Sequence, residues 1–254
     1  MTTTSLITGA SSGLGAEYAR ALARRGDRLV LVARDRARLQ EQAAQLRRAG
    51  AAEVEVLAAD LADPGGVAEV VARLADPARP VGMLINSAGF GLPLSFEDND
   101  IEVEVRHLRL HDEVPMRLMH AVLPGMLERG TGTILNIASV SAVMPRSTYG
   151  AAKAWQVQFS LWANGRYRPR GVTVTAVCPG YTHTDFHARL GLAKGEEGIP
   201  DWMWLEAPRV VADSLEDARR GRAVSVPCRR YRAIWTAARF APPALVSHLA
   251  ARGR

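Results

Sequence analysis

Ser5-Leu-Ile-Thr8-Gly9-Ala-Ser-Ser-Gly13-Leu-Gly15 is a short apolar run that ends in a glycine-rich turn, and residues 16–25 after it have a helical composition. A strand, such a turn and a helix in this order point backbone N–H groups and a helix N-terminus toward a pyrophosphate. Glycine is needed there because a side chain would block the approach of the backbone and disfavour positive φ. The spacing is GxxxGxG rather than GxGxxG, so by itself the turn is either a dinucleotide-binding loop or a plain βα turn.

Short apolar runs recur along the chain and alternate with helical segments. Strands are expected at residues 5–8, 28–33, 54–57, 83–86, 133–138, 172–177 and 223–226, and helices at 16–25, 36–48, 64–74, 97–129, 149–164 and 209–220. Pro115 should kink or split the long helical stretch, because proline lacks the N–H that a helix needs. The alternation predicts an α/β, Rossmann-type, doubly wound and mostly parallel seven-stranded sheet with helices on both faces. We see no linker or repeat, so residues 1–254 are expected to form a single domain.

Composition limits the location and the chemistry. The two cysteines, Cys178 and Cys228, lie far apart with no CxxC pattern, so neither a disulfide framework nor a zinc site is expected. The first strand begins near Ser5, which leaves no room for a signal peptide, and no apolar run approaches the ~20 residues of a membrane-spanning helix. We therefore expect a soluble, cytoplasmic protein without a metal.

Positive charge is concentrated in the last part of the chain. Residues 219–254 contain nine arginines and no acidic residue, whereas the net charge of the whole chain is +6. This basic C-terminal extension, about 227–254, is expected to be a solvated or subunit-facing surface, and no nucleic acid partner is expected. An amphipathic element at 231–249 lying on a membrane surface is the less favoured alternative, because Pro242-Pro243 interrupts it.

Tyr149-Gly-Ala-Ala-Lys153, with Ser139 upstream, carries the candidate chemistry. Residues four apart on a helix share one face, and an ammonium beside a phenol favours the phenolate, which would make tyrosine usable as a general acid/base. The Ser139 hydroxyl could then polarise a substrate carbonyl. Only two of the 32 basic residues are lysines, Lys153 and Lys194, and lysine is a compact charge whose pKa can be tuned. The alternative is a surface Tyr/Lys pair without a role.

Two strand ends carry further candidates for binding a nucleotide. The strand at 28–33 ends at Arg34, where a domain specific for NAD usually has an acidic residue for the ribose 2′-hydroxyl. Arg34 suits a 2′-phosphate instead, with Arg38 as possible help, although exposed arginines are common in this chain. Asp60 follows the third strand and could reach an adenine edge or simply cap a turn. These features favour NADP(H) over NAD(H).

Five motifs in order, Thr8-Gly9-x-x-x-Gly13-x-Gly15, Asn86-x-Ala88-Gly89, Ser139, Tyr149-x-x-x-Lys153 and Pro179-Gly180, resemble the short-chain dehydrogenase/reductase family over residues 2–226. The resemblance implies a hydride transfer in which Tyr149 is the acid/base, Lys153 lowers its pKa and holds the nicotinamide ribose, and Ser139 binds the substrate oxygen. It also implies a homodimer or homotetramer. The cofactor-binding residues it indicates, together with Arg34, are Gly9, Ser11, Ser12, Gly13, Leu14, Gly15, Asp60, Leu61, Asn86, Ala88, Gly89, Tyr149, Lys153, Pro179, Gly180, Thr182 and Thr184.

The chain departs from the family pattern at Ser87, where the family usually has a second asparagine after Asn86, and in two further places. The interval from Ser139 to Tyr149 is short, which leaves Ser141 as a minor alternative for the serine role. Where many members have an asparagine that holds a proton-relay water, this chain has His111. Imidazole both donates and accepts and titrates near neutrality, so His111 is either a proton relay itself or a packing residue.

Residues about 181–206 fall where the family places its substrate lid. Their large apolar side chains could line a pocket with few polar anchors, which favours a hydrophobic ketone or alcohol; they are Phe186, Leu190, Leu192, Trp202, Met203, Trp204 and Leu205. The sequence therefore predicts an NADP(H)-dependent oxidoreductase that acts on a carbonyl or secondary alcohol. The alternative is a catalytically silent NADP(H)-binding redox sensor or scaffold.

Overall fold

The computed structural model, which describes residues 2–145, 147–184, 186 and 199–241, contains one parallel sheet of seven strands. The strand order is β3-β2-β1-β4-β5-β6-β7, and every pairing is parallel. The strands are β1 (Thr4–Thr8), β2 (Arg28–Ala33), β3 (Glu53–Ala58), β4 (Met83–Asn86), β5 (Gly132–Ile137), β6 (Val172–Val177) and β7 (Val224–Ser225). The predicted Rossmann-type fold in a single domain is confirmed, and the sheet is fully parallel rather than mostly so.

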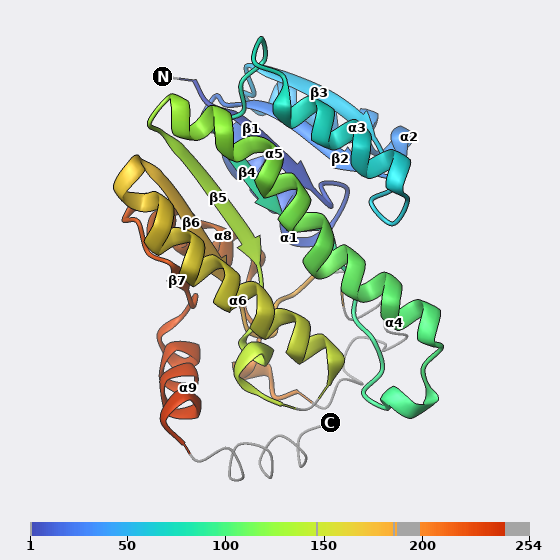
Figure 1. Cartoon of the computed structure of the whole chain (residues 1–254), viewed down its shortest axis with the longest axis vertical. Coiled ribbons are helices and arrows are strands. Elements are labelled where there is room, and N and C mark those ends of the chain that lie inside the picture. Colours follow the sequence, from blue (N-terminus) through green and yellow to red (C-terminus); the bar gives the residue numbers. More distant parts are fainter. Residues whose placement is uncertain (1, 146, 185, 187–198, 242–254) are drawn as a thin grey trace.

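Helices cover both faces of the sheet, so its strands are apolar on both sides. One face packs against α1 (Gly13–Ala23), α2 (Arg36–Arg48) and α8 (Ala207–Arg219). The other face packs against α3 (Pro64–Ala75), α5 (Val114–Glu128) and α6 (Thr148–Tyr167), which lie in front of the sheet in Figure 1. The alternation is visible in β1, where Leu6 faces the second set of helices and Ile7 the first.

Side chains at the strand-to-helix turns fix where most of these helices begin. The carboxylates of Asp35 and Asp63 accept N–H groups of the first turns of α2 and α3. Asp100 and Ser147 do the same for α4 (Ile101–Leu108) and α6. Such caps satisfy N–H groups that have no partner inside the helix. In α1 no described side chain caps the first turn and no acidic residue lies in it, which suits a helix N-terminus that faces an anion.

The segment predicted as one helix at 97–129 is divided. A short 3₁₀ helix, η1 (Phe96–Asp98), precedes α4, and a π-helical turn, η2 (Arg109–Glu113), separates α4 from α5. In this turn the Val114 N–H donates to the Arg109 carbonyl, five residues back. Pro115 lies in the first turn of α5, where its missing N–H is tolerated. The expected interruption at Pro115 is confirmed, and its form is a π turn.

The last described helix, α9 (Arg229–Phe240), packs against the body of the domain. Its buried residues Tyr231 and Trp235 join a core cluster formed with β6, α6 and β7, while Phe240 is exposed. Residues 242–254, the rest of the basic extension, lie outside the described residues. No described helix combines the length and apolar character that crossing a bilayer requires. Three further 3₁₀ helices are η3 (Val140–Val143), η4 (Arg168–Arg170) and η5 (Asp201–Met203).

Gly171 provides a test of the packing at the amino ends of β5 and β6. Its φ is +82°, and a Cβ there would lie 1.8 Å from the Gly130 carbonyl oxygen. The left-handed conformation alone costs an alanine about 1–2 kcal/mol, so Gly171→Ala should lower the free energy of unfolding by about 2 kcal/mol or more. Gly165→Ala is the matched control, because that glycine lies in α6 with nothing within 4 Å of an added Cβ.

The control should raise stability by about 0.5–1 kcal/mol, because glycine is a poor helix former. Both variants are compared with the wild type by urea unfolding. Equal stability of Gly171→Ala and Gly165→Ala would contradict the close approach of the two backbone segments.

Candidate active site

The strand order reverses between β1 and β4, and the loops that leave these two strands meet at the carboxyl edge of the sheet. Ligands bind open α/β sheets at such a switch point. Thr8, the last residue of β1, holds the two loops together, because its hydroxyl oxygen accepts the Ser87 and Ala88 N–H groups at 3.0 and 3.1 Å. A Cβ on Gly9, whose φ is +66°, would lie 2.9 Å from the Ala88 backbone. The crossing of these loops therefore requires glycine at position 9.

The glycine-rich turn lies where the sequence predicted it, between β1 and α1. Gly13 opens α1 with a φ of +55°, and a Cβ on Gly15 would lie 2.4 Å from the Gly9 carbonyl oxygen. Ser11 and Ser12 are half-buried in the turn, and Leu14 packs partly into the core. Small residues, positive φ values and a helix N-terminus without an acidic first turn form a cradle that fits a pyrophosphate.

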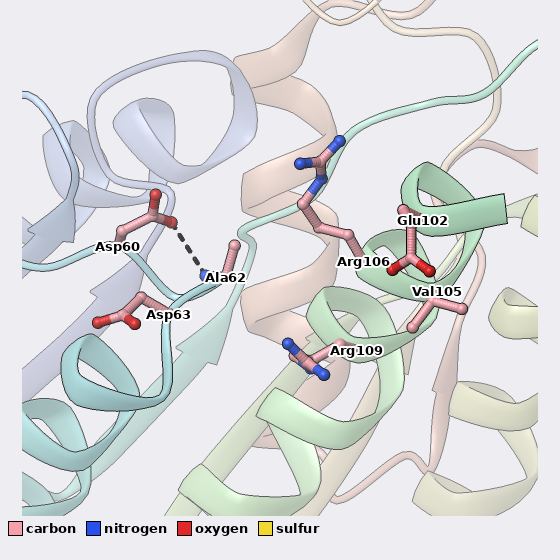
Figure 2. A pocket seen from close by; sticks show the side chains of 7 residues that line it. All are labelled: Asp60, Ala62, Asp63, Glu102, Val105, Arg106 and Arg109. Carbon is pink, nitrogen blue, oxygen red and sulfur yellow. Dashed lines mark hydrogen bonds between the residues drawn. The ribbon is translucent and has the colours of Figure 1, made fainter. Parts of the chain in front are cut away.

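Arg34 and Asp60 occupy the ends of the neighbouring strands β2 and β3. Arg34 is exposed directly after β2, where its guanidinium is available to a bound anion. Asp60 accepts the Ala62 N–H at 2.9 Å, so it does cap a turn, and it also lines an open pocket of about 380 Å³. Figure 2 shows Arg106 and Arg109 of the α4–η2 segment on the opposite side of this pocket. Leu61 is buried in the core, so only its backbone can face a cofactor.

Asn86, at the end of β4, belongs to a buried polar chain that runs across the sheet edge into α6. Its amide donates to Asn136 at 2.8 Å, and Asn136 donates to Ser160 at 2.9 Å. The Ser160 hydroxyl donates to the Gln156 carbonyl at 2.7 Å. Buried polar groups with partners hold their neighbours in one arrangement, so this chain fixes α6 relative to the ends of β4 and β5.

Ser139 and Tyr149 meet at this edge. Ser139 follows β5 and caps η3 by accepting the Ser141 N–H at 3.1 Å, and its side chain interacts with the Tyr149 hydroxyl in the direction that lowers the tyrosine pKa. Ser141 is the partner that accepts the Ser139 hydroxyl at 3.2 Å. The direct contact with tyrosine favours Ser139 over Ser141 for the serine role.

Tyr149 is half-buried among other aromatic rings. Its ring lies 5.8 Å from those of His107 and His111 and 5.9 Å from that of Phe186, measured between centroids. Burial raises the pKa of Tyr149 to about 12, although the hydrogen bond with Ser139 opposes the rise. The pKa of Tyr149 is therefore raised, where the sequence predicted that Lys153 would lower it, and the phenol is protonated at neutral pH. A protonated phenol is a proton donor.

Lys153 is almost fully buried, with 4% of its surface exposed. Its ammonium donates to the Ile137 carbonyl at 2.6 Å and to Gln156 Oε1 at 3.0 Å, and it lies 5.5 Å from the centroid of the Tyr149 ring. Burial lowers the pKa of Lys153 to about 7, while the charge of Asp112 opposes that shift. Burial likewise raises the pKa of Asp112 to about 7. Both groups are thus poised to change charge near neutrality.

His111 lies in the π turn and not on a regular helix face. Its Nε2 is 2.9 Å from the Phe90 carbonyl oxygen and 3.2 Å from the Phe90 nitrogen, so its role depends on the tautomer. Burial holds the pKa of His111 well below its usual range, so the expectation that it titrates near neutrality is wrong. Gly89 makes room for the ring, because a Cβ there would lie 2.5 Å from His111 Cε1. The His111 main chain, rather than its ring, connects to Lys153 through Gln156.

The loop after β6 closes the site on the other side. The Pro179 carbonyl accepts the Val140 N–H at 3.0 Å, and a Cβ on Gly180 would collide with the Tyr231 ring of α9. Thr182 is buried and donates to the Gly180 carbonyl at 2.9 Å. Thr184 lies beside Gly13, at 3.6 Å from the Cβ that an alanine there would carry. Of these four residues, Thr184 is the one that reaches the glycine-rich turn.

Among the described residues of the predicted lid, Phe186 is the large apolar residue whose ring lies near Tyr149. Phe186 contacts the tyrosine, whereas Met203 and Leu205 belong to a core cluster and Trp202 is exposed. Trp204 stacks on His183 with 4.7 Å between ring centroids. Leu190 and Leu192 lie outside the described residues.

Three residues of the site were not singled out from the sequence. His107 stacks on His111 at 4.2 Å between centroids, Asp112 faces Lys153 electrostatically, and Gln156 bonds to Lys153. His107 and Asp112 are near His111 in the sequence, but the directions of these side chains depend on the π turn at Arg109–Glu113, which was not predicted. Gln156 is three residues after Lys153 on a helix, and side chains at this spacing can contact each other. This spacing could have indicated Gln156 as a partner of Lys153 from the sequence alone.

The fold and this cluster define a Rossmann-type domain with a tyrosine, a lysine and a serine at the switch point of its sheet. The sequence of residues 3–194 matches the model of the short chain dehydrogenase family. The chain therefore belongs to the short-chain dehydrogenase/reductase family, whose members are oxidoreductases that act on alcohol and ketone groups.

Individual relatives agree with this assignment. A short-chain dehydrogenase from Sphingobium yanoikuyae in complex with NADPH is 40% identical, with a TM-score of 0.85 over 92% of this chain and 91% of that one. The bulky-bulky ketone specific alcohol dehydrogenase from Comamonas testosteroni is 33% identical, with a TM-score of 0.80 over 93% and 92%. An uncharacterized oxidoreductase of Staphylococcus saprophyticus is 34% identical over 70% of this chain and 78% of its own length. Several longer relatives are matched over only 59–63% of their length.

Proposed function

We propose that this chain is an NADP(H)-dependent oxidoreductase that interconverts a carbonyl group and a secondary alcohol of a hydrophobic small molecule. The observation that carries the proposal is the cluster in which the half-buried side chains of Ser139 and Tyr149 interact and the buried Lys153 ammonium lies 5.5 Å from the centroid of the tyrosine ring. This cluster lies at the same sheet edge as the pyrophosphate cradle at Gly9–Gly15. A protein that only binds a nucleotide does not need an acid, a lysine and a hydroxyl together.

Each residue of the cluster has a separate task in the proposed reaction. The nicotinamide, when bound, supplies or accepts the hydride. Tyr149, protonated at neutral pH, donates its proton to the substrate oxygen during reduction, and its phenolate takes a proton during oxidation. The Ser139 hydroxyl holds that oxygen and polarises the carbonyl. The Lys153 ammonium stabilises negative charge as it develops on Tyr149.

The preference for NADP(H) is proposed from Arg34. An exposed guanidinium at the end of β2 is placed where a 2′-phosphate can be bound, and arginine suits bidentate contacts with phosphate. The Sphingobium yanoikuyae relative, which is 40% identical, is in complex with NADPH. Both observations support the phosphorylated cofactor over NAD(H).

A hydrophobic substrate is proposed from the surroundings of the acid. Tyr149 is flanked by Phe186 and by two histidine rings, and burial keeps both histidines uncharged at neutral pH: the pKa of His107 is lowered to about 4 and that of His111 well below its usual range. These three uncharged rings can make apolar contacts with a substrate. The relative from Comamonas testosteroni is described as specific for bulky-bulky ketones, which supports the same substrate class here.

A homodimer or homotetramer is proposed as the assembly, located in the cytoplasm. The outer side of α6 carries a row of stacked aromatic rings, Trp155, Phe159 and Trp162, with 4.8 and 5.7 Å between successive centroids. Trp162 is 57% exposed. A second copy that covers this row would remove apolar surface from water, which supports self-association.

Replacing Arg34 tests the choice of cofactor. Arg34→Ala should weaken NADPH binding roughly 10- to 100-fold, the loss expected for hydrogen bonds to a charged group, and leave NADH binding nearly unchanged. The measurement is a titration of nicotinamide fluorescence with each cofactor. Arg48→Ala is the control, because Arg48 is an equally exposed arginine at the opposite end of α2. Equal loss in both variants, or tighter NADH than NADPH binding by the wild type, would contradict the role of Arg34.

The pH dependence of ketone reduction tests the state of Lys153. Its pKa of about 7 predicts that kcat/KM for NADPH falls as the pH rises through about 7, because the ammonium is lost, while Tyr149 stays protonated throughout. In Lys153→Arg the guanidinium keeps its charge, so this fall should disappear even where the overall rate is lower. An identical fall in the wild type and in Lys153→Arg would assign it to another group.

A further inference from the structure

Pro115 removes the α-helical donor of one carbonyl in the π turn. In an α-helix the His111 carbonyl would accept the N–H four residues later, and that residue is Pro115, which has none. The turn is deep in the protein, with His111 1% exposed. A buried carbonyl without a donor is costly, so the structure must supply one from elsewhere.

Gln156 is that donor. Its side-chain nitrogen donates to the His111 carbonyl, while its Oε1 accepts the Lys153 ammonium at 3.0 Å. The residue is 3% exposed. Its own main-chain carbonyl is held by Ser160, the end of the polar chain that begins at Asn86. The glutamine therefore connects the π turn to the lysine and is itself fixed at its base.

We propose that Gln156 is a positioning residue for the reaction: its amide bridges the Lys153 ammonium and the His111 carbonyl and thereby fixes the direction of the lysine toward Tyr149. The inference rests on the proposed function and deepens it, because the family resemblance assigns no role to this position. The proposal also explains how a histidine can replace the asparagine that many family members have at position 111. In this chain the main-chain carbonyl of that residue accepts the Gln156 amide, so the side chain is not needed for the contact.

The two contacts determine the orientation of the amide. A flipped amide would place its N–H groups against an ammonium, which has three donors and no acceptor. Two of the three lysine N–H groups are taken by Ile137 and Gln156, so the direction of the third is set. A primary amide that accepts on one side and donates on the other holds its partners in place without carrying a charge.

Because the bridge acts on the ammonium, changing it should move the pKa of Lys153. The other ionisable groups around the lysine lie on α4, η2, α6 and the end of β6, and they are His107, His111, Asp112, Tyr149 and Cys178. These groups are the same in every variant below. Gln156→Glu puts a carboxylate beside the ammonium, which should raise the pKa by about one unit or more, whereas Gln156→Leu removes the acceptor and should lower it.

The scarcity of lysine makes this measurable without any substrate. Protein labelled with [13Cε]lysine should give signals from only Lys153 and Lys194, and Lys153→Arg assigns them. The Lys153 midpoint is followed by NMR against pH in the wild type, Gln156→Glu, Gln156→Leu and Gln158→Leu. Gln158 is an exposed glutamine two residues further along α6, so its variant controls for loss of a glutamine from this helix.

The expected result is an upward shift in Gln156→Glu, a downward shift in Gln156→Leu and no shift in Gln158→Leu. Midpoints in both Gln156 variants that coincide with that of Gln158→Leu, or that move in the same direction, would overturn the proposal. Thermal melts of the four proteins show that the compared chains are folded. Since no turnover is involved, an absence of ketone reduction would count against the proposed function and leave the test of Gln156 intact.

Discussion

The burial of the Lys153 ammonium is the constraint around which the site is built. An ammonium inside a protein is unfavourable unless it is paired and hydrogen-bonded, and this one is bonded to the end of β5 and to Gln156 of its own helix. Asp112 favours its charged form, while burial brings its pKa down to about 7. The strand end, the π turn and α6 must therefore keep their relative positions for the lysine to remain charged beside Tyr149.

The sheet supplies that rigidity through contacts at its carboxyl edge. Thr8 binds the loop after β4, and the chain from Asn86 through Asn136 and Ser160 reaches the base of Gln156. A series of hydrogen bonds thus connects the loops at the switch point, where we propose that the nucleotide binds, to Gln156, which bonds to the lysine. Within the described residues, the place for the cofactor and the place for the acid are two parts of one hydrogen-bonded edge.

Regular periodicity and glycine spacing made most of the fold predictable. The strands at 28–33, 83–86 and 172–177 were predicted to the residue, and the structure places Lys153 and Ser139 beside Tyr149. What could not be predicted depends on tertiary contacts. Proline indicated a break in the helix at 97–129, but not that the break would be a π turn whose free carbonyl needs Gln156. The raised pKa of Tyr149 was not predicted, because the amount of burial cannot be obtained from the spacing of two residues.

Transfer of deuterium from cofactor to product tests the central claim most directly, namely that the chain catalyses hydride transfer at the cluster of Ser139, Tyr149 and Lys153. NADPH deuterated at either face of C4 is incubated with the protein and a panel of bulky hydrophobic ketones, and the alcohol is analysed by mass spectrometry and NMR. The account predicts that deuterium from one face appears on the carbinol carbon, and that Tyr149→Phe binds NADPH but forms almost no alcohol. NADPH binding without transfer to any ketone, or equal transfer by Tyr149→Phe, would contradict it.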